Sequence, residues 1–342
     1  MTALNNLEKA IQTANYTRYK MGQTTGHYES FFQRANHPTL PFAFWIRYTI
    51  FSPAENPEKA IGELWAIWFD GVEGRQVAVK KEVPISQCTF SSTDFNVRVG
   101  EAALTSGALN GSAVSGGNHI TWHLTYSGSA PPLFMLPLER YQSSFPKAKS
   151  LVGFPCATYR GTIAVNDKVH EISDWLGSQN HNWGSQHTDH YAWGQVAGFD
   201  NNPESFLEVA TARIRIGPFW TPFLTPVVLR HGGEEIRLNS MRQMFRARGS
   251  FSYFVWTFLS ENSRFKVEGT ISATRSAFVG LRYYNPPGGE KHCLNTKIGS
   301  CEVKVTNKQR GYESKPEILF TAHRAAFEIL TDERDHGVTI QA

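Results

Sequence analysis

Alternating apolar and polar residues dominate the chain from residue 41 onward, and this pattern predicts β-strands. In residues 119–126, isoleucine, tryptophan, leucine and tyrosine alternate with histidine and threonine, which is typical of a strand with one buried face. Residues 42–51 and 61–70 carry large apolar side chains on both sides, so both faces of these strands are expected to be covered. Short segments rich in Gly, Pro, Asn and Asp separate the strands and mark turns.

The remaining segments add one helix and two connections to this all-β pattern. Residues 5–14 predict a short helix, because apolar positions recur four residues apart behind an asparagine cap. Residues 26–38 are polar and aromatic-rich, which suggests an ordered loop or an edge strand, and residues 131–149 read as a long connection. Residues 159–172 predict a hairpin that leads into the middle of the chain.

Two successive sets of short strands favour two all-β domains, each a barrel or a sandwich. The chain length of 342 residues agrees with this division, since one core seldom extends through so long a chain. We therefore predict an N-terminal domain over residues 1–190 and a C-terminal domain over residues 191–342.

The amino-acid composition narrows the kinds of ligand that the protein is expected to bind. Aromatic residues make up 13% of the chain and charged residues 19%, and this balance favours a pocket for an apolar ligand. The net charge of +4 is spread along the sequence without a basic run, so nucleic acid is not an expected partner.

Cysteine usage and hydropathy bear on the compartment. The four cysteines form no C-x-x-C pair; Cys293 and Cys301 could pair across neighbouring strands, although free buried thiols are expected in a cytoplasmic protein. No segment has the continuous apolar length of a membrane helix, and the first residues lack the apolar core of a signal peptide. We predict a cytoplasmic protein without an integral membrane segment, and leave a homodimer open.

Histidine and tryptophan concentrate in residues 179–195, which hold three of the twelve histidines and two of the nine tryptophans. His181 and Trp183 lie two positions apart, so an extended backbone places both on one face. An imidazole beside an indole can deliver a proton while the ring stabilises positive charge that develops on a substrate. The alternative is a histidine that hydrogen-bonds to the main chain and tethers a loop.

Glu208 is the candidate acidic partner, because it interrupts an otherwise apolar strand face over residues 206–216. Burial raises the pKa of a carboxyl, and a raised pKa suits a general acid or base. The alternatives are an internal salt bridge to Arg47, Arg213 or Arg215, or a glutamate that faces a water-filled cavity.

Metal ligation and nucleotide binding have little support. His181, His187, Asp189 and His190 follow a spacing that matches none of the common metal motifs. Glycine-rich phosphate loops and the G-x-S-x-G nucleophile motif are absent from the sequence. We expect neither a metal nor an organic cofactor.

The segment His181-Asn182-Trp183-Gly184, followed by Tyr191-Ala192-Trp193-Gly194, resembles the lipocalin-like superfamily of carotenoid 1,2-hydratases, tocopherol cyclases and AttH-type proteins. Fungal decalin-forming Diels–Alderases are more distant relatives of this group, and residues 161–172 resemble the hairpin that precedes the motif. The resemblance implies two consecutive calycin-like barrels or sandwiches with an elongated apolar pocket. It also implies cofactor-free hydration or cyclisation of an isoprenoid, or a pericyclic reaction.

In hydratase-like members the His-x-Trp pair is implicated, and it falls here on His181 and Trp183. Those members also use a downstream aromatic residue and a carboxylate; no Tyr–Asp pair stands at a matching place, and Glu208 is the nearby carboxylate on an apolar face.

We therefore expect a hydratase, cyclase or pericyclase, of lyase or isomerase type, that acts on an isoprenoid-like or polyketide-like small molecule. The alternative is a non-catalytic carrier of the same kind of hydrophobic ligand. The predicted catalytic residues are His181, Trp183 and Glu208, and the predicted substrate-binding residues are Asn182, His190, Tyr191, Trp193, Gln195, Trp45 and Trp68.

Overall fold

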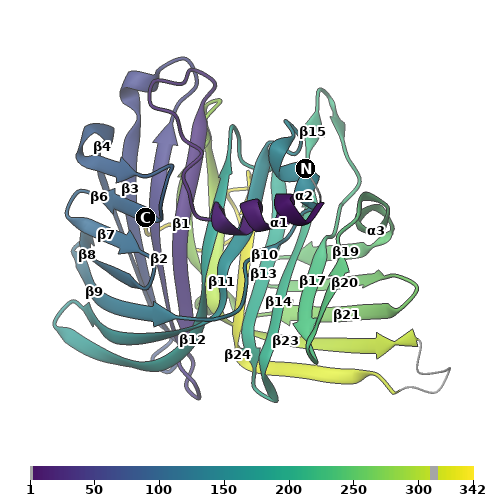
Figure 1. Cartoon of the computed structure of the whole chain (residues 1–342). Coiled ribbons are helices and arrows are strands. Elements are labelled where there is room, and N and C mark those ends of the chain that lie inside the picture. The colour runs from purple at the N-terminus through teal and green to yellow at the C-terminus, as the bar shows by residue number, and fades with distance from the viewer. Residues whose placement is uncertain (1–2, 309–314) are drawn as a thin grey trace.

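The computed structural model describes residues 3–308 and 315–342, and almost all of its regular structure is antiparallel β-sheet (Figure 1). Two large sheets curl into barrel-like halves, one built from the first half of the chain and one from the second. This is the predicted all-β architecture of two consecutive barrel-like units with a short N-terminal helix. The chain passes from one sheet to the other between Gly184 and His190.

The first sheet contains twelve strands in the order β4-β3-β2-β1-β12-β11-β9-β8-β7-β6-β5, with β10 paired to β11. Its strands are β1 His27–Asn36, β2 Phe42–Ser52, β3 Ile61–Asp70, β4 Arg75–Pro84, β5 Cys88–Phe90, β6 Asn96–Val99, β7 Ala102–Thr105, β8 Ala108–Ser115, β9 Asn118–Ser127, β10 Leu133–Phe134, β11 Ala148–Val165 and β12 Lys168–Gly184.

The second sheet has the order β18-β17-β14-β13-β24-β23-β21-β20-β19, with β22 paired to β23, and a small hairpin of β15 and β16 stands apart. These strands are β13 His190–Phe199, β14 Asn202–Arg213, β15 Arg215–Ile216, β16 Phe219–Trp220, β17 Val227–His231, β18 Glu234–Leu238, β19 Arg248–Ser252, β20 Val255–Glu261, β21 Phe265–Ser272, β22 Val279–Tyr284, β23 Glu290–Asn307 and β24 Glu317–Thr331. The helices are α1 Ala3–Gln12, α2 Leu138–Gln142 and α3 Met241–Arg246, and the 3-10 turns are η1 Pro57–Lys59, η2 Ile85–Gln87 and η3 Arg275–Ala277.

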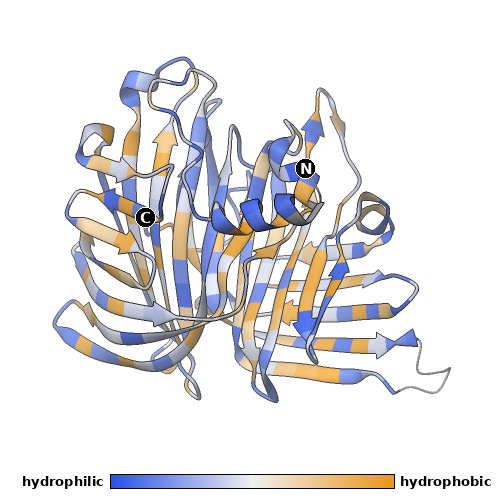
Figure 2. Cartoon of the chain, viewed as in Figure 1, coloured by the Kyte–Doolittle hydropathy of each residue, from blue (hydrophilic) through white to orange (hydrophobic). Residues whose placement is uncertain are grey.

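The two sheets lie against each other, and we call the layer between them the intersheet seam. It is formed by one face of β1, β2, β3 and β12 and the facing side of β13, β14, β22, β23 and β24. Each half also has its own apolar interior. Figure 2 shows hydrophilic positions along β1 in the middle of the molecule, where β1 lies between β2 and β12.

Strand β1 lies between β2 and β12 and is completely buried, so the prediction of a loop or edge strand over residues 26–38 is wrong. Alternate residues face opposite layers, because side-chain direction reverses at each step along a strand. Glu29 and Phe31 point into the N-terminal barrel, whereas Phe32 and Arg34 point into the seam. Most polar side chains of β1 make hydrogen bonds inside the protein, which lowers the cost of their burial, although Gln33 Nε2 and Arg34 Nε are buried without a partner among the described residues.

Other sequence expectations agree with the structure. Helix α1 begins two residues before the predicted start and packs on the N-terminal barrel through Leu7, Ala10 and Ile11. Strands β2 and β3 are covered on both faces, and the predicted hairpin turn joins β11 to β12. All four cysteines are free. The described residues contain no helix that is both long and apolar enough to cross a membrane.

Candidate functional site

His181 lies on β12, opposite Phe31 of β1 and Leu151 of β11, with its side chain inside the N-terminal barrel. Its imidazole is fully buried and stacks on the Phe31 ring, with the ring centroids 4.2 Å apart and the planes 15° from parallel. The Trp183 indole lies on the same side of the strand, 4.6 Å from the imidazole centroid. The alternation of β12 thus brings His181 and Trp183 together, as their spacing predicts.

The partner of His181 is Glu29, a fully buried carboxylate that the sequence analysis did not single out. The His181 Nε2 atom lies 2.7 Å from Glu29 Oε1. Four further groups direct hydrogen bonds to the same carboxylate: the Thr17 hydroxyl at 2.7 Å, the Arg18 amide at 2.8 Å, the Tyr19 amide at 2.9 Å and His27 Nε2 at 2.9 Å.

So many donors favour the ionised form of Glu29. Burial alone would raise the pKa of this carboxyl, but the hydrogen bonds and charges of His181 and His27 hold it well below its ordinary value. The carboxylate is therefore an anchored, fully buried negative charge inside the N-terminal barrel.

Both ring nitrogens of His181 face hydrogen-bond acceptors. Nε2 meets the Glu29 carboxylate, and Nδ1 lies 2.7 Å from the Ala14 carbonyl oxygen. A carbonyl oxygen and a carboxylate can only accept, so both contacts are satisfied when the imidazole carries two protons. Burial lowers the pKa of His181 in spite of the Glu29 contact, which makes the imidazolium a stronger acid than a histidine in water.

Three buried amide atoms near this pair have no hydrogen-bond partner among the described residues: Gln33 Nε2, Gln179 Oε1 and Asn15 Oδ1. The Gln33 carbonyl oxygen accepts a hydrogen bond from the Tyr159 hydroxyl, so its amino group is the free end. Gln179 and Asn15 approach each other beside Gly153, where an added Cβ would fall 2.0 Å from Gln179 Oε1 and 2.5 Å from Asn15 Nδ2. Since buried polar atoms seldom lack partners, this corner of the barrel is suited to hydrogen-bond a ligand hydroxyl, which can both donate and accept.

The segment from Thr13 to Tyr19, which follows α1, covers the His181–Glu29 pair. Its Ala14 carbonyl occupies His181 Nδ1, and its next residues donate to Glu29. The guanidinium of Arg18 lies 5.1 Å from the Trp183 ring centroid, in a cation–π contact that closes the site on the outside. Access to Nδ1 therefore requires this segment to shift.

Glu208 lies in the intersheet seam rather than beside His181. Its carboxylate accepts hydrogen bonds from Trp193 Nε1 and Gln195 Nε2, each at 2.8 Å. Gln195 also donates to Asn180 Oδ1 at 2.7 Å and accepts from Arg34 Nη1 at 3.1 Å, so its amide is fixed between the two sheets. Burial raises the pKa of Glu208 to about 7, although both hydrogen bonds and the Arg34 charge oppose the rise.

The remaining predicted residues fall into three places. Asn182, Trp45 and Tyr191 face the seam, where Asn182 accepts a hydrogen bond from the Ser30 hydroxyl. His190 lies on the other side of the second sheet, 4.9 Å from Phe251 by ring centroids, and Trp68 packs in the core of the N-terminal barrel. The structure thus unites His181 with Trp183, and Glu208 with Trp193 and Gln195, but it does not bring these two groups together.

The four residues considered as metal ligands, His181, His187, Asp189 and His190, do not converge either. His187 stacks on Tyr28, with the centroids 3.9 Å apart, whereas Asp189 accepts a hydrogen bond from the Arg215 amide. Within residues 3–308 and 315–342, no group of three or more His, Cys, Asp or Glu is placed to hold a metal ion.

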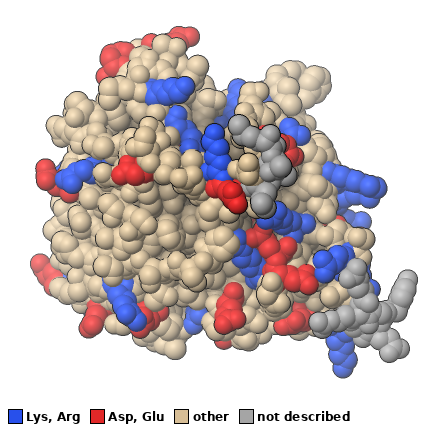
Figure 3. Space-filling view, viewed as in Figure 1, with Lys and Arg blue, Asp and Glu red and all other residues tan. Residues whose placement is uncertain are grey.

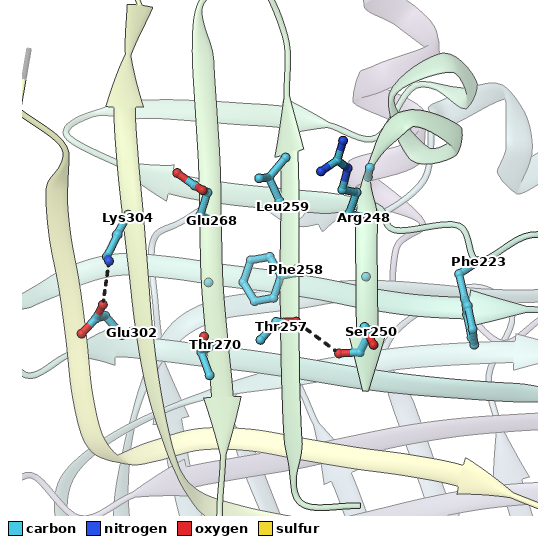
Figure 4. Close-up of a pocket in the computed structure, with 13 residues that line it drawn as sticks. Phe223, Arg248, Ser250, Thr257, Phe258, Leu259, Glu268, Thr270, Glu302 and Lys304 are labelled. Atoms are coloured by element: carbon cyan, nitrogen blue, oxygen red, sulfur yellow. Dashed lines mark hydrogen bonds and ion pairs between the residues drawn. The ribbon is translucent and has the colours of Figure 1, made fainter. Parts of the chain in front are cut away.

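A shallow depression of about 570 Å³ lies on the outer face of β19, β20, β21 and β23 (Figure 4). It contains none of the candidate residues, and two of its charged lining residues, Glu302 and Lys304, pair with each other. Charged side chains of both signs are interspersed on the face of the molecule shown in Figure 3. Neither feature competes with the two buried polar groups as a site.

Comparison with known proteins identifies one similar sequence and several structures with a similar fold. No family model matches the chain. An uncharacterized protein found in two strains of Mycobacterium tuberculosis is 22% identical over 297 residues, which is 82% of both chains.

Three solved structures share the architecture. A protein assigned as AttH from Nitrosomonas europaea has a TM-score of 0.54 at 11% identity, covering 90% of this chain and 92% of its own. Kievitone hydratase from Nectria haematococca has a TM-score of 0.57 at 12% identity, covering 90% and 89%. CghA in complex with Sch210972 has a TM-score of 0.54 at 13% identity, covering 92% and 90%. The resemblance inferred from the His-x-Trp motif is thereby confirmed as a shared fold.

Sequence reasoning missed Glu29 and the amides of Gln33 and Gln179. A signal was present, because His27, Glu29, Phe31 and Gln33 occupy alternate positions of a segment that is rich in aromatic residues. The face of Glu29 also carries His27 and Gln33, so it lacks the apolar pattern that identified Glu208.

Proposed function

We propose that this protein is a cofactor-independent enzyme of lyase or isomerase type, in which His181 gives a proton to a hydrophobic small molecule. The observation that carries the proposal is the arrangement of His181, whose two ring nitrogens both meet acceptors inside a barrel. An imidazolium held in this way, shielded from water and with a lowered pKa, is an acid poised for transfer.

The proposed hydration begins when the Ala14 carbonyl leaves His181 Nδ1 and the substrate takes its place. Nδ1 then donates its proton to one alkene carbon, and the positive charge moves to the neighbouring carbon. A water molecule attacks that carbon and returns one proton to Nδ1, so the imidazolium is restored and one water has been added. In a cyclisation, an internal nucleophile replaces the water in the same sequence.

The groups around His181 have distinct roles in this proposal. Glu29 keeps the imidazolium in place and balances its charge, because it holds Nε2 through a charge-assisted hydrogen bond. The faces of Trp183 and Phe31 flank the reacting centre and favour a cationic intermediate. Gln33 offers a free N–H that would donate to an oxygen of the substrate, and Gln179 and Asn15 offer free carbonyl oxygens that would accept from a substrate hydroxyl.

The fold comparisons support this reaction class without naming the substrate. One structural neighbour is a hydratase of kievitone, and its fold is the same at low sequence identity. The isoprenoid-like or polyketide-like ligand expected from the sequence would suit a barrel interior that is lined by Phe, Tyr and Trp. In this proposal Glu208, with Trp193 and Gln195, supports the seam and takes no part in proton transfer.

The test is turnover of kievitone and a panel of prenylated phenols, followed by mass spectrometry for the gain of one water. Replacing His181 with Gln is expected to lower the rate by about 10²–10⁴-fold, because a positioned general acid contributes that much. His190→Gln is the matched control and should retain the activity, since His190 lies in the other half of the molecule.

Two further variants sharpen the assignment. Gly153→Ala places a methyl group against Gln179 and Asn15, so it should weaken substrate binding while leaving the His181–Glu29 pair intact. Glu208→Gln should leave the turnover within about threefold; a loss comparable with that of His181→Gln would move the acid to the seam.

A carrier of a hydrophobic ligand is the second candidate. The observation in its favour is that the segment from Thr13 to Tyr19 already satisfies both His181 and Glu29, as a purely structural tether would. Mass spectrometry of the purified protein separates the two functions. A bound apolar molecule that is never converted, together with unchanged affinity in His181→Gln, favours the carrier.

A further inference from the structure

The hairpin of β15 and β16 projects from the second half of the molecule, toward the upper right of Figure 1. Its Ile216 pairs with Phe219 across a two-residue turn, Gly217-Pro218. Gly217 has a φ of 59°, which a glycine adopts without strain at the first position of such a turn. The turn therefore presents the residues on either side of it as a defined tip.

The tip of this hairpin is apolar and exposed to solvent. The exposed fraction is 62% for Ile216, 76% for Phe219 and 42% for Trp220, and Figure 3 shows uncharged atoms at this place. Scattered apolar residues are ordinary on a protein surface. Three of them on one small hairpin, two with aromatic rings, are typical of a site that contacts a partner or a membrane.

Two arginines adjoin the tip. The Arg213 guanidinium carbon lies 4.5 Å from the Trp220 ring centroid and 5.0 Å from that of Phe223, so it is held beside the indole. Arg215 is exposed, and its backbone amide donates a hydrogen bond to the Asp189 carboxylate at 2.9 Å. One carboxylate thus stands at the base of a hairpin that carries two guanidinium groups.

The charge around the tip is positive. Residues 209–233 contain three arginines and no Asp or Glu. Arg230 pairs with Glu235 at 2.7 Å, whereas Arg213 and Arg215 form no ion pair among the described residues. The two arginines beside the tip are therefore available to a negatively charged surface.

An apolar tip with adjoining cations suits the surface of a bilayer that contains anionic phospholipids. Trp and Phe side chains enter the boundary between headgroups and acyl chains, and each cation near such a surface favours binding by about fivefold. A second copy of the chain is less suited, because each partner of a stable dimer contributes about 800 Å². An aromatic side chain offers at most about 250 Å², and the three residues at the tip are only partly exposed.

We propose that the β15–β16 hairpin docks the protein on membranes that contain anionic phospholipids. Ile216, Phe219 and Trp220 enter the bilayer interface, and Arg213 and Arg215 lie against the lipid phosphates. The contact is peripheral, because only the tip of the hairpin enters the headgroup layer. This surface goes beyond the proposed proton-transfer function and does not depend on it.

Co-sedimentation of the full-length protein with lipid vesicles tests the proposal. One preparation contains phosphatidylcholine alone, and the other is an equimolar mixture of phosphatidylcholine and phosphatidylserine. The protein should bind the mixed vesicles at least about tenfold more tightly, and added salt should weaken this binding because ions screen exposed charges. If the mixed vesicles do not retain the protein, or if both preparations bind it equally, the proposal is wrong.

Phe219→Ser removes the most exposed apolar side chain of the tip and should lower the affinity for mixed vesicles by about tenfold. Phe320→Ser is the matched control, because Phe320 is an exposed phenylalanine on β24 and not on the hairpin. Both variants should keep the wild-type melting temperature, since neither side chain is buried. Equal losses of vesicle binding in the two variants would overturn the assignment to the hairpin.

Arg215→Gln tests the charge separately from the apolar tip. It should lower the affinity for mixed vesicles by about fivefold and leave the affinity for phosphatidylcholine unchanged. Arg98→Gln is the matched control, because Arg98 is an exposed arginine on β6 of the first sheet, and it should bind as the wild type does. An Arg215→Gln variant that binds mixed vesicles like the wild type would contradict the proposal.

A contact between two copies of the chain gives a different result. Sedimentation equilibrium without lipid would then show a dimer for the wild type and a monomer for Phe219→Ser, and the vesicles would not retain the protein. That outcome would overturn the membrane assignment and place the tip in a dimer interface.

Discussion

Glu29 and Glu208 are both buried carboxylates on inner strands, yet their surroundings drive their pKa values in opposite directions. Glu29 receives hydrogen bonds from two histidines, two backbone amides and a hydroxyl, and its pKa lies below the ordinary value. Glu208 receives two, from neutral side chains, and burial raises its pKa to about 7. The comparison shows that the donors around a buried carboxylate, more than its depth, decide whether it carries charge.

The strongest test of this contrast is the replacement of Glu29 by Gln. The change removes the buried charge that accepts hydrogen bonds from two histidines, a hydroxyl and two backbone amides, so the free energy of unfolding should fall by about 3–5 kcal/mol. Urea unfolding at neutral pH measures the loss. Glu261→Gln is the control, because that carboxylate is half exposed beside Lys308 and should cost at most about 1 kcal/mol. Equal losses in the two variants would contradict the special role of the buried pair.

The dependence of the free energy of unfolding on pH in the acidic range tests the direction of the Glu29 pKa shift. Because its folded pKa lies below the unfolded value near 4.5, ionised Glu29 stabilises the fold above pH 4.5, and this contribution disappears as the pH falls toward the folded pKa. Glu29→Gln should therefore lose less stability on acidification than the wild type does. A variant whose acid limb is as steep as that of the wild type would assign the acid sensitivity to other groups.

The contribution of Glu208 to stability should depend on pH in the opposite direction. Its folded pKa of about 7 exceeds the unfolded value of 4.5, so the unfolded chain releases its proton first as the pH rises. The contribution of Glu208 to stability should fall by about 3 kcal/mol between pH ~4.5 and ~7 and remain constant above. Urea unfolding of wild type and Glu208→Gln at both ends of this range measures the difference. The proposal for Glu208 fails if the two proteins show the same change.

A smaller effect is expected when one donor to Glu208 is removed. Trp193→Phe deletes the indole N–H that binds Glu208 Oε1 and should cost about 1–3 kcal/mol through the unsatisfied carboxylate. Trp65→Phe is the matched control, since the Trp65 indole N–H is buried without a partner and its removal should cost less. Thermal unfolding at pH 8 separates the two, and a larger loss in Trp65→Phe would contradict the assignment.

The sequence predicted the parts of this molecule that depend on local pattern. Alternation identified the doubly covered strands β2 and β3, and the position of Glu208 on an apolar face identified a buried carboxylate. The spacing of His181 and Trp183 correctly placed both on one side of a strand. These inferences work because side-chain direction along a strand follows from position alone.

The parts that failed depend on contacts between distant segments. Strand β1 contains many polar residues, so its sequence alone predicts an exposed segment. Its burial depends on partners from distant parts of the chain, because β12 supplies His181 to Glu29 and β13 supplies Gln195 to Arg34. Likewise, the separation of His181 from Glu208 follows from a sheet that lies between the N-terminal barrel and the seam. Periodicity assigns a face to each residue, but the layer that the face meets is decided by topology.

Strand β1 supplies Glu29 to one layer and Arg34 to the other, so evolution is expected to conserve the length of this strand. Insertion or deletion of a single codon in its first half would exchange the two faces, burying an anion where a cation is needed. A single substitution can be compensated by a change in a neighbouring residue. A one-residue insertion or deletion instead moves every following side chain of the strand to the opposite face. We therefore expect descendants of this gene to vary in the loops around β1 and to keep its length.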